Sequence, residues 1–302
     1  QTGSTWIMGE GNSVACEGKP GVSDSFGQAL YLTALLLSYA TLGAARTYMH
    51  SGASLLTGLE SSKELNQGTA DGSPSFSTYI YFYPTASSAR GEKRANPGYL
   101  SQLLLAEAIG TSGKAQPVAL DVPSPLSQSS LYINAIYDSA VSGGGDDTGA
   151  ARLVIVNAKP YMTDDSTRGS IKLNISALLP AGTQPSNFTA KRLTSPHTDT
   201  TDADLTTWAG QSFKYGAANG TLSIENIENG TVALRDSEAL LVFLKGKAFG
   251  APSGGKQIAS GGGSATTPSA ESAASSAAPR LVVAVQVVLL SVGITLGSVM
   301  LC

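Results

Sequence analysis

A strand, a long apolar helix and a second strand follow one another within the first fifty residues of the chain. The run TWIMGE, residues 5–10, predicts a short buried strand that ends on Glu10, and residues 45–50 predict the second strand. Between them, residues 26–42 are apolar on nearly every face of a helix, with Ser23 as its expected N-cap. A helix of this kind has to be covered on both sides. The order and the spacing are typical of a parallel βαβ unit.

A different pattern begins after residue 113. Before that point lie a long irregular segment, residues 51–96, and a predicted helix at residues 99–109 that begins after Pro97. Beyond it, the apolar runs are short and are separated by Pro, Gly, Asn and Asp. We expect strands at residues 117–122, 131–137, 152–157, 170–175, 188–193, 221–224 and 239–244. Such spacing is typical of an antiparallel β-sandwich that closes its own core.

The end of the chain predicts a membrane anchor. Residues 281–302 carry no charge and are long enough to cross the ~30 Å hydrocarbon core of a bilayer as a helix. No basic residue follows them, whereas a retained membrane helix usually has Lys or Arg on its cytoplasmic side. The pattern favours a cleaved signal for a glycosylphosphatidylinositol (GPI) anchor, preceded by a Ser-, Gly- and Ala-rich linker at residues 250–280 that we expect to be disordered. The candidate attachment residues are Gly263, Ser264, Ser269 and Ser272. A retained transmembrane helix is the alternative.

Four N-x-S/T sequons in the second half of the chain predict an extracellular, glycosylated protein at the cell surface. Their acceptors are Asn174, Asn187, Asn219 and Asn229. The net charge is -3, and Lys and Arg occur singly rather than in runs, so we expect no nucleic-acid partner. Because no cluster of His, Cys and Asp has the spacing of metal ligands, we expect neither a metal nor an organic cofactor.

The most informative run is GEGNSVACEGKPGVSD, residues 9–24. It resembles the nucleophile segment of glycoside hydrolase family 79, which includes fungal β-glucuronidases and the relatives of heparanase. In that family the nucleophilic glutamate stands at the end of a barrel strand. Three more stretches are similar to the family: residues 46–50 look like the last barrel strand, Pro97-Gly98-Tyr99 looks like the start of the last barrel helix, and residues 232–244 look like the closing strands of the C-terminal sandwich.

The resemblance implies a fold that is α/β in one part and all-β in the other. Residues 1–113 would be the last β/α units of a catalytic (β/α)8 barrel, and residues 114–249 would be an antiparallel β-sandwich domain. The chain begins at Gln1 without a signal peptide although secretion is expected, so we expect the N-terminal part to be missing. In the family, the acid/base residue lies on an earlier barrel strand. We therefore expect the chain as given to be inactive alone.

Glu10 is the residue that the resemblance assigns as the nucleophile of a retaining glycoside hydrolase. A carboxylate at the C-terminal end of a parallel strand faces the mouth where (β/α)8 enzymes keep their catalytic groups. From composition and spacing alone, Glu10 would be a solvated loop acid. Asn12 and His50 lie where they could contact the hydroxyls of a carbohydrate substrate. For each there is an alternative, an Asn that holds a loop or a His that is satisfied at a strand end.

One departure from the family concerns the sugar. Family members that bind a uronic acid have a Gly-x-Gly-Tyr-like loop after the last barrel strand, whereas residues 50–56 read HSGASLL here. The expected tyrosine is missing, and the long insert offers Tyr79, Tyr81 and Tyr83 instead. The hypothesis is therefore a β-glucuronidase-like hydrolase of extracellular glycans or glycoconjugates whose sugar specificity is open. A non-catalytic cell-surface glycoprotein that binds glycans is the rival hypothesis.

Overall fold

The computed structural model describes residues 6–14, 18–51, 76–86, 90–122, 126, 130–141, 149–179 and 188–244. All of them belong to one compact unit, residues 1–249. The predictions for the linker, for the hydrophobic tail with its anchor candidates, and for Asn187 lie outside the described residues. Within the described part of the chain, no helix has the length and apolar character needed to cross a membrane.

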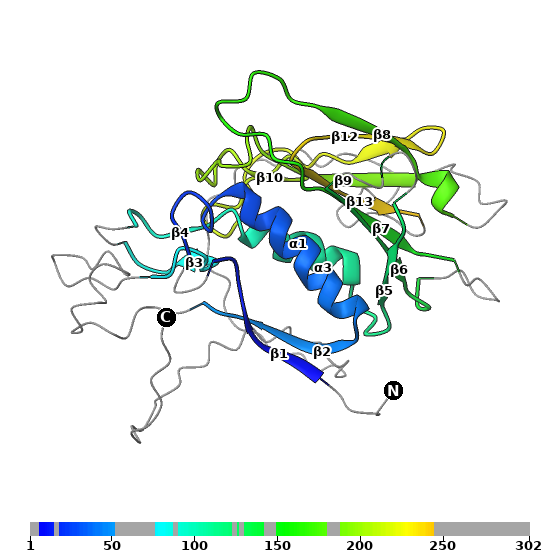
Figure 1. Ribbon diagram of the computed structural model, residues 1–302, viewed down its shortest axis with the longest axis horizontal. Coiled ribbons are helices and arrows are strands. Elements are labelled where there is room, and N and C mark those ends of the chain that lie inside the picture. Colours follow the sequence, from blue (N-terminus) through cyan, green and yellow to red (C-terminus); the bar gives the residue numbers. More distant parts are fainter. Residues whose placement is uncertain are drawn as a thin grey trace, which may run out of the picture. The chain divides into compact units, whose positions relative to one another are not determined.

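The predicted βαβ unit is present. Strand β1 (Trp6–Gly11) pairs in parallel with β2 (Ala44–Met49), and helix α1 (Phe26–Thr41) connects them (Figure 1). The prediction of Ser23 as the N-cap is wrong, because Ser25 holds that position. The Ser23 hydroxyl instead accepts a hydrogen bond from a backbone N–H of the preceding loop, so it closes a turn there and the helix begins later.

Beyond residue 113 the strands form one large antiparallel sheet. Its strands are β5 (Gln116–Leu120), β6 (Leu131–Tyr137), β7 (Arg152–Asn157), β9 (Phe188–Thr194), β10 (Thr207–Trp208), β11 (Glu225–Ile227) and β13 (Glu238–Phe243). They follow the order β10-β9-β13-β7-β6-β5, and β11 also pairs with β9. Each pairing in this sheet is antiparallel, as the short strands with turn residues between them predict.

The predicted strand at residues 221–224 is wrong. These residues form no ladder, since the backbone N–H of Ser223 donates to the carbonyl of Ala209 in a loop, and the strand that pairs with β9 begins at Glu225. The two-residue strand β10 was too short to give a periodic signal.

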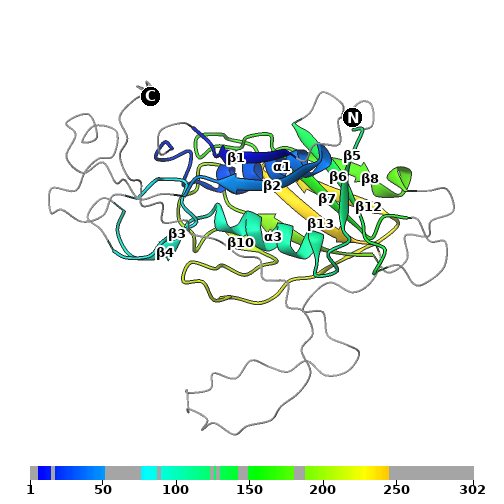
Figure 2. The same ribbon diagram turned by 90° about the horizontal axis from the view of Figure 1, so that it is seen from below.

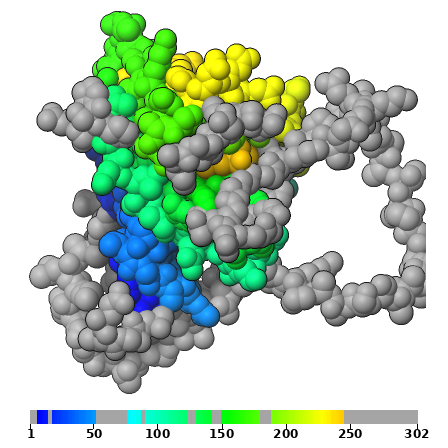
Figure 3. Space-filling model, turned by 90° about the vertical axis from the view of Figure 1, so that its right-hand side faces the viewer, coloured from blue at the N-terminus to red at the C-terminus, as the bar shows by residue number. Residues whose placement is uncertain are grey.

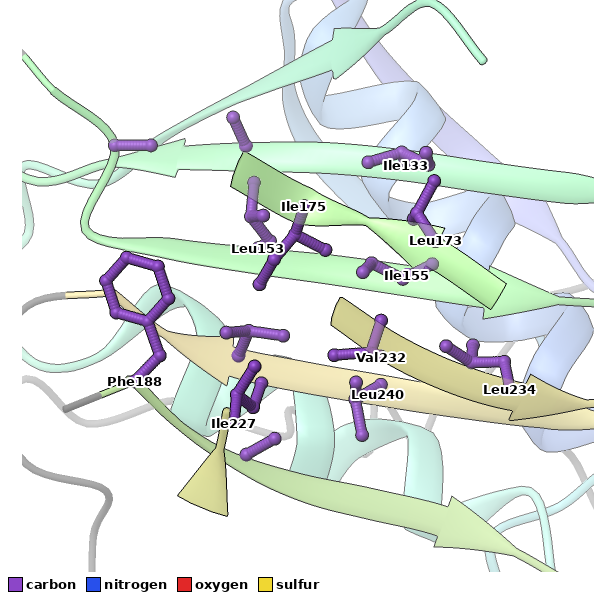
Figure 4. Packing of buried hydrophobic residues seen from close by; sticks show 14 of the residues in the cluster. Ile133, Leu153, Ile155, Leu173, Ile175, Phe188, Ile227, Val232, Leu234 and Leu240 are labelled. Carbon is purple, nitrogen blue, oxygen red and sulfur yellow. The ribbon is translucent and has the colours of Figure 1, made fainter. Parts of the chain in front are cut away.

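A second, smaller pair of strands covers one face of the large sheet. Strand β8 (Ser170–Asn174), which leads into a short 3-10 helix at Ile175–Leu178, pairs with β12 (Thr231–Arg235). Leu173 and Val232 of this pair belong to the same apolar cluster as Ile155 of the sheet (Figure 4). Burial of each such side chain stabilises the fold by about 1.5–3 kcal/mol.

Helices cover the other face of the sheet, and this differs from the expected sandwich. Helix α1 contacts β5 and β7, and α3 (Tyr99–Ile109) contacts β7 and β10 (Figure 2). From top to bottom, Figure 1 shows β8 and β12, the large sheet, the two helices, and then β1 and β2. Figure 3 shows the same direction on the surface, with the green and yellow residues at the top and the blue N-terminal residues at the bottom. The sheet is therefore not a self-contained sandwich. One of its faces depends on helices from the first part of the chain, and closure of a barrel around β1 and β2 stays a prediction.

Candidate active site

Glu10 lies near the C-terminal end of β1, the strand in which the GEGNS motif begins. Its side chain is 73 % exposed, and its Oε1 lies 4.0 Å from Nε2 of His50. His50 immediately follows β2, and its backbone N–H donates to the carbonyl of Gly11 at 2.9 Å. The parallel pairing of β1 and β2 thus brings together two candidate residues that are forty positions apart in sequence.

His50 is oriented by a tyrosine from the long insert. The Tyr79 hydroxyl lies 2.6 Å from Nδ1 of His50, and the two rings meet edge to face with their centroids 5.5 Å apart. Tyr79 is buried, so its position is fixed by packing. With Nδ1 held in this way, the other ring nitrogen of His50 faces Glu10.

The other two tyrosines of the insert are structural. Tyr81 accepts a hydrogen bond from the Gln102 amide on α3, and burial raises its pKa well above the usual range. Tyr83 is buried in strand β3 (Phe82–Tyr83), which pairs with β4 (Arg94–Ala95). Of the three insert tyrosines, the structure therefore places Tyr79 against His50.

Asn12 makes several hydrogen bonds within the protein. Its Nδ2 donates to the carbonyl of His50 at 2.8 Å, and its Oδ1 accepts from the N–H of Ser13 at 2.8 Å and from Nε2 of Gln28 at 2.5 Å. This geometry fits the alternative in which the asparagine holds the loop, and contact with a sugar stays a prediction. The sequence analysis missed Gln28. Its only signal in the sequence was an amide within a mostly apolar helix, and the structure shows that this amide is buried.

The loop after Glu10 packs closely on this site. The Ser13 hydroxyl donates to that of Ser23 at 3.0 Å, and the backbone at Gly18 passes so near to Tyr79 and Ser23 that a side chain there would overlap them. Gly18 also has a φ of +83°, which glycine adopts without strain. The GKPGVSD part of the motif thus begins in close contact with Tyr79, the residue that holds His50.

A family model matches part of the β-rich region of the chain. Residues 136–241 match the model described as "Glycosyl hydrolase family 79 C-terminal beta domain". Over these residues the chain is similar to the C-terminal β domain of glycoside hydrolase family 79. The resemblance to this family that the sequence analysis described is confirmed by the match.

A solved structure shares the fold of this chain. It is a crystal structure of a 4-O-α-L-rhamnosyl-β-D-glucuronidase from Fusarium oxysporum 12S in complex with Rha-GlcA, with 22 % sequence identity and a TM-score of 0.56. The match covers 80 % of this chain and 43 % of the Fusarium protein, so the chain spans less than half of that protein's length. No curated protein sequence matches the chain.

Three of the predicted glycosylation acceptors lie on the surface of the family 79 domain. Asn174 is exposed at the end of β8, Asn219 is exposed in a loop, and Asn229 is exposed in the turn before β12. Their positions leave room for a glycan, and modification stays a prediction. In the described part of the chain, no group of three or more His, Cys, Asp or Glu side chains comes together as a metal site would require.

Proposed function

We propose that this chain is the C-terminal part of a retaining, β-glucuronidase-like glycoside hydrolase in which Glu10 is the nucleophile. The observation that carries the proposal is the position of Glu10: a largely exposed carboxylate near the C-terminal end of a parallel strand, within the GEGNS motif and next to His50. Parallel β/α enzymes place their reacting groups at this end of their strands. The family 79 domain in the same chain and the glucuronidase fold neighbour support the assignment.

In the proposed mechanism, a Glu10 oxygen attacks the anomeric carbon while a carboxylic acid ~5–5.5 Å away protonates the departing glycosidic oxygen. Water then cleaves the glycosyl-Glu10 ester, and the second carboxyl group takes a proton from that water. Nε2 of His50 is close enough to steady the Glu10 carboxylate before the attack.

We propose that the acid/base residue belongs to further strands of a barrel that β1 and β2 join. Exposure of the apolar residues on these two strands supports this step. Trp6, Ile7 and Tyr48 are all exposed, with Ile7 at 54 %, whereas parallel strands are normally covered on both faces. The segment that would cover them is the one that carries the missing carboxyl group.

The proposal extends to the location of the protein, which we place outside the cell on a GPI anchor. The sequons and the uncharged residues 281–302 support it. Phosphatidylinositol-specific phospholipase C should then release the protein from cells. Retention of a protein that still contains residues 281–302 would instead show a transmembrane helix.

The function itself is tested by labelling the full protein with 2-deoxy-2-fluoro-β-glucuronosyl fluoride, and with the corresponding glucosyl fluoride for the open sugar specificity. The fluorine slows the second step, so the glycosyl-enzyme accumulates and peptide mass spectrometry locates it. We expect the label on Glu10. A label on another carboxylate would refute the assignment, and an unlabelled protein that still binds glycans would favour the non-catalytic rival.

A further inference from the structure

The β domain, by which we mean the matched residues 136–241, caps helix α1, which follows the proposed nucleophile strand β1. The first N–H groups of a helix have no acceptor within it, and the Ser25 side chain makes no capping bond to α1. Two carbonyls from a loop of the β domain take that role. The N–H of Phe26 donates to the carbonyl of Thr200 at 2.8 Å, and the N–H of Gly27 donates to that of Thr198 at 2.7 Å. We call residues 195–200 the capping loop.

Arg168 ties the capping loop to the turn between β12 and β13. Its guanidinium donates to the carbonyls of Ser195 at 2.9 Å and Pro196 at 3.3 Å in the loop, and to those of Asp236 at 2.8 Å and Ser237 at 2.9 Å in the turn. A planar guanidinium with several donors fixes the relative position of two segments in a way that one ammonium group does not.

Thr198 joins the capping loop to the same region of the β domain. Its hydroxyl accepts from the N–H of Tyr161 at 2.7 Å and is in hydrogen-bond contact with the Ser237 hydroxyl. Its methyl group lies against Gly27 of α1. The residue therefore has one side fixed in the β domain and the other on the first turn of the helix.

From the first turn of α1, the connection continues to the site through Gln28. This buried residue follows Gly27 directly and donates to Oδ1 of Asn12. Asn12 in turn holds the carbonyl of His50 and lies two positions after Glu10. Hydrogen bonds and short stretches of backbone thus connect Arg168 to Asn12, the residue that follows β1.

We infer that the β domain positions the catalytic glutamate, with Thr198 and Gln28 as positioning residues. The inference rests on the proposed role of Glu10. A shift of the capping loop would move the first turn of α1, and Gln28 would carry that shift to Asn12 and to the strand ends that hold Glu10 and His50. Misplacement of a reacting group by ~1 Å costs on the order of a hundredfold in rate, so partial loosening should cost less than this.

The test compares Thr198→Val and Gln28→Met in the full protein. Thr198→Val keeps the methyl contact but deletes the hydroxyl, and we expect kcat to fall about fivefold with KM within about twofold of wild type. Gln28→Met removes the bond to Asn12 itself, and we expect about a tenfold loss of kcat. Thr198→Ser restores the hydroxyl and should recover most of the activity. Because both variants act along one connection, the double variant should lose less than the product of the single losses.

Amide hydrogen exchange at Ser13 gives a readout that does not depend on turnover. This N–H is bonded to Asn12, and both variants should make it exchange several times faster than in wild type. Val232→Ala is the control, since it loosens the core beneath β12 without touching the capping loop. It should lower the Tm but leave kcat and the Ser13 exchange unchanged.

Each outcome decides something. Unchanged Ser13 exchange in both variants would overturn the inference, and so would an equal loss of kcat in Val232→Ala. If the variants exchange Ser13 faster than wild type does, but the wild-type protein neither turns over substrate nor labels at Glu10, the positioning connection holds and the proposed function fails.

Discussion

Strands β7 and β1 are both short apolar runs, yet their surroundings differ completely. Every residue of β7 is buried, and its central residue Ile155 has no exposed surface. In β1, Trp6 and Ile7 are exposed. The exposure differs because different elements pack on the two strands. Strand β7 lies between the β8–β12 pair and the helices, whereas β1 and β2 have α1 on one side.

The comparison distinguishes a region that buries its own apolar core from a region whose apolar residues stay exposed. The β domain buries its apolar residues in a core that is covered on both faces. The β1–β2 pair leaves both apolar strand residues and the Glu10 carboxylate exposed. The main core and the proposed nucleophile therefore lie in different regions, and substitutions at each should affect stability and activity to different extents.

The largest expected effect is a loss of turnover when the Glu10 carboxylate is replaced. Glu10→Gln in the full protein keeps the shape of the side chain but cannot form the glycosyl ester, so turnover should fall on the order of a thousandfold or more, or ~4 kcal/mol in the barrier. The free energy of unfolding should hardly change, because the side chain is exposed. Steady-state kinetics and urea unfolding measure the two quantities. Near-normal activity of this variant would make Glu10 a loop acid.

A second pair of variants compares the strands directly. Ile155→Ala leaves a cavity in the core and should cost about 4 kcal/mol of unfolding free energy. Ile7→Ala should cost less than about 1 kcal/mol in the chain of residues 1–249, since its side chain is more than half exposed there. Urea unfolding of both variants gives the numbers. In the full protein the cost of Ile7→Ala should rise if further strands cover β1, and an unchanged small cost would count against the barrel.

A third prediction concerns the buried carboxylate of the β domain, Glu238. It is fully buried and accepts from the guanidinium groups of Arg192 at 2.8 Å and Arg235 at 2.7 Å. Burial alone would raise its pKa, but hydrogen bonds from Arg235 and the charges of both arginines outweigh burial and lower it. Glu238→Gln should therefore cost about 3 kcal/mol at neutral pH, because Arg235 loses its carboxylate partner and Arg192 keeps only Glu225.

The sign of the pH dependence follows from that lowered pKa. The contribution of Glu238 is fully present above the unfolded-state pKa of about 4.3 and is lost as the pH falls below it toward the folded-state pKa. The stability gap between wild type and Glu238→Gln should narrow from pH 5 downward. Urea unfolding over this range measures the gap, and a gap that stays constant would contradict the role of the ion pairs. Turnover at neutral pH should be less affected than in Glu10→Gln.

Sequence alone predicted the elements better than their contacts. The helices at Phe26–Thr41 and Tyr99–Ile109 and most of the longer strands could be placed, because apolar runs and turn residues are local signals. The strand at residues 221–224 failed because neighbouring β-prone residues cannot be told apart without their ladder partner. The helix-covered face of the sheet could not be predicted either, since an apolar helix does not indicate which sheet it covers.

The site was predictable to a similar degree. The motif brought attention to Glu10, and the βαβ spacing brought His50 near it. Tyr79 comes from the long insert, and its contact with His50 depends on a tertiary arrangement that no local pattern encodes. Gln28 was hidden because a single amide in an apolar helix looks like an ordinary exception until its acceptor is known.

The smallest expected effect concerns the predicted glycosylation site at Asn229. Asn229 lies in the turn before β12 and has a φ of +54°. Strand β12 belongs to the layer at the top of Figure 1, and β1 and β2 form the layer at the bottom. Asn adopts this left-handed conformation more readily than Ala, so Asn229→Ala should cost about 1 kcal/mol of unfolding free energy. Thr231→Ala removes the same sequon without changing that backbone position. Produced in a glycosylating host, both variants should lose one glycan by mass spectrometry, but Asn229→Ala alone should show the conformational cost when the unglycosylated proteins are unfolded in urea. A wild-type protein without a glycan at Asn229 would refute the modification, whereas equal stability of the two variants would show that the turn tolerates alanine.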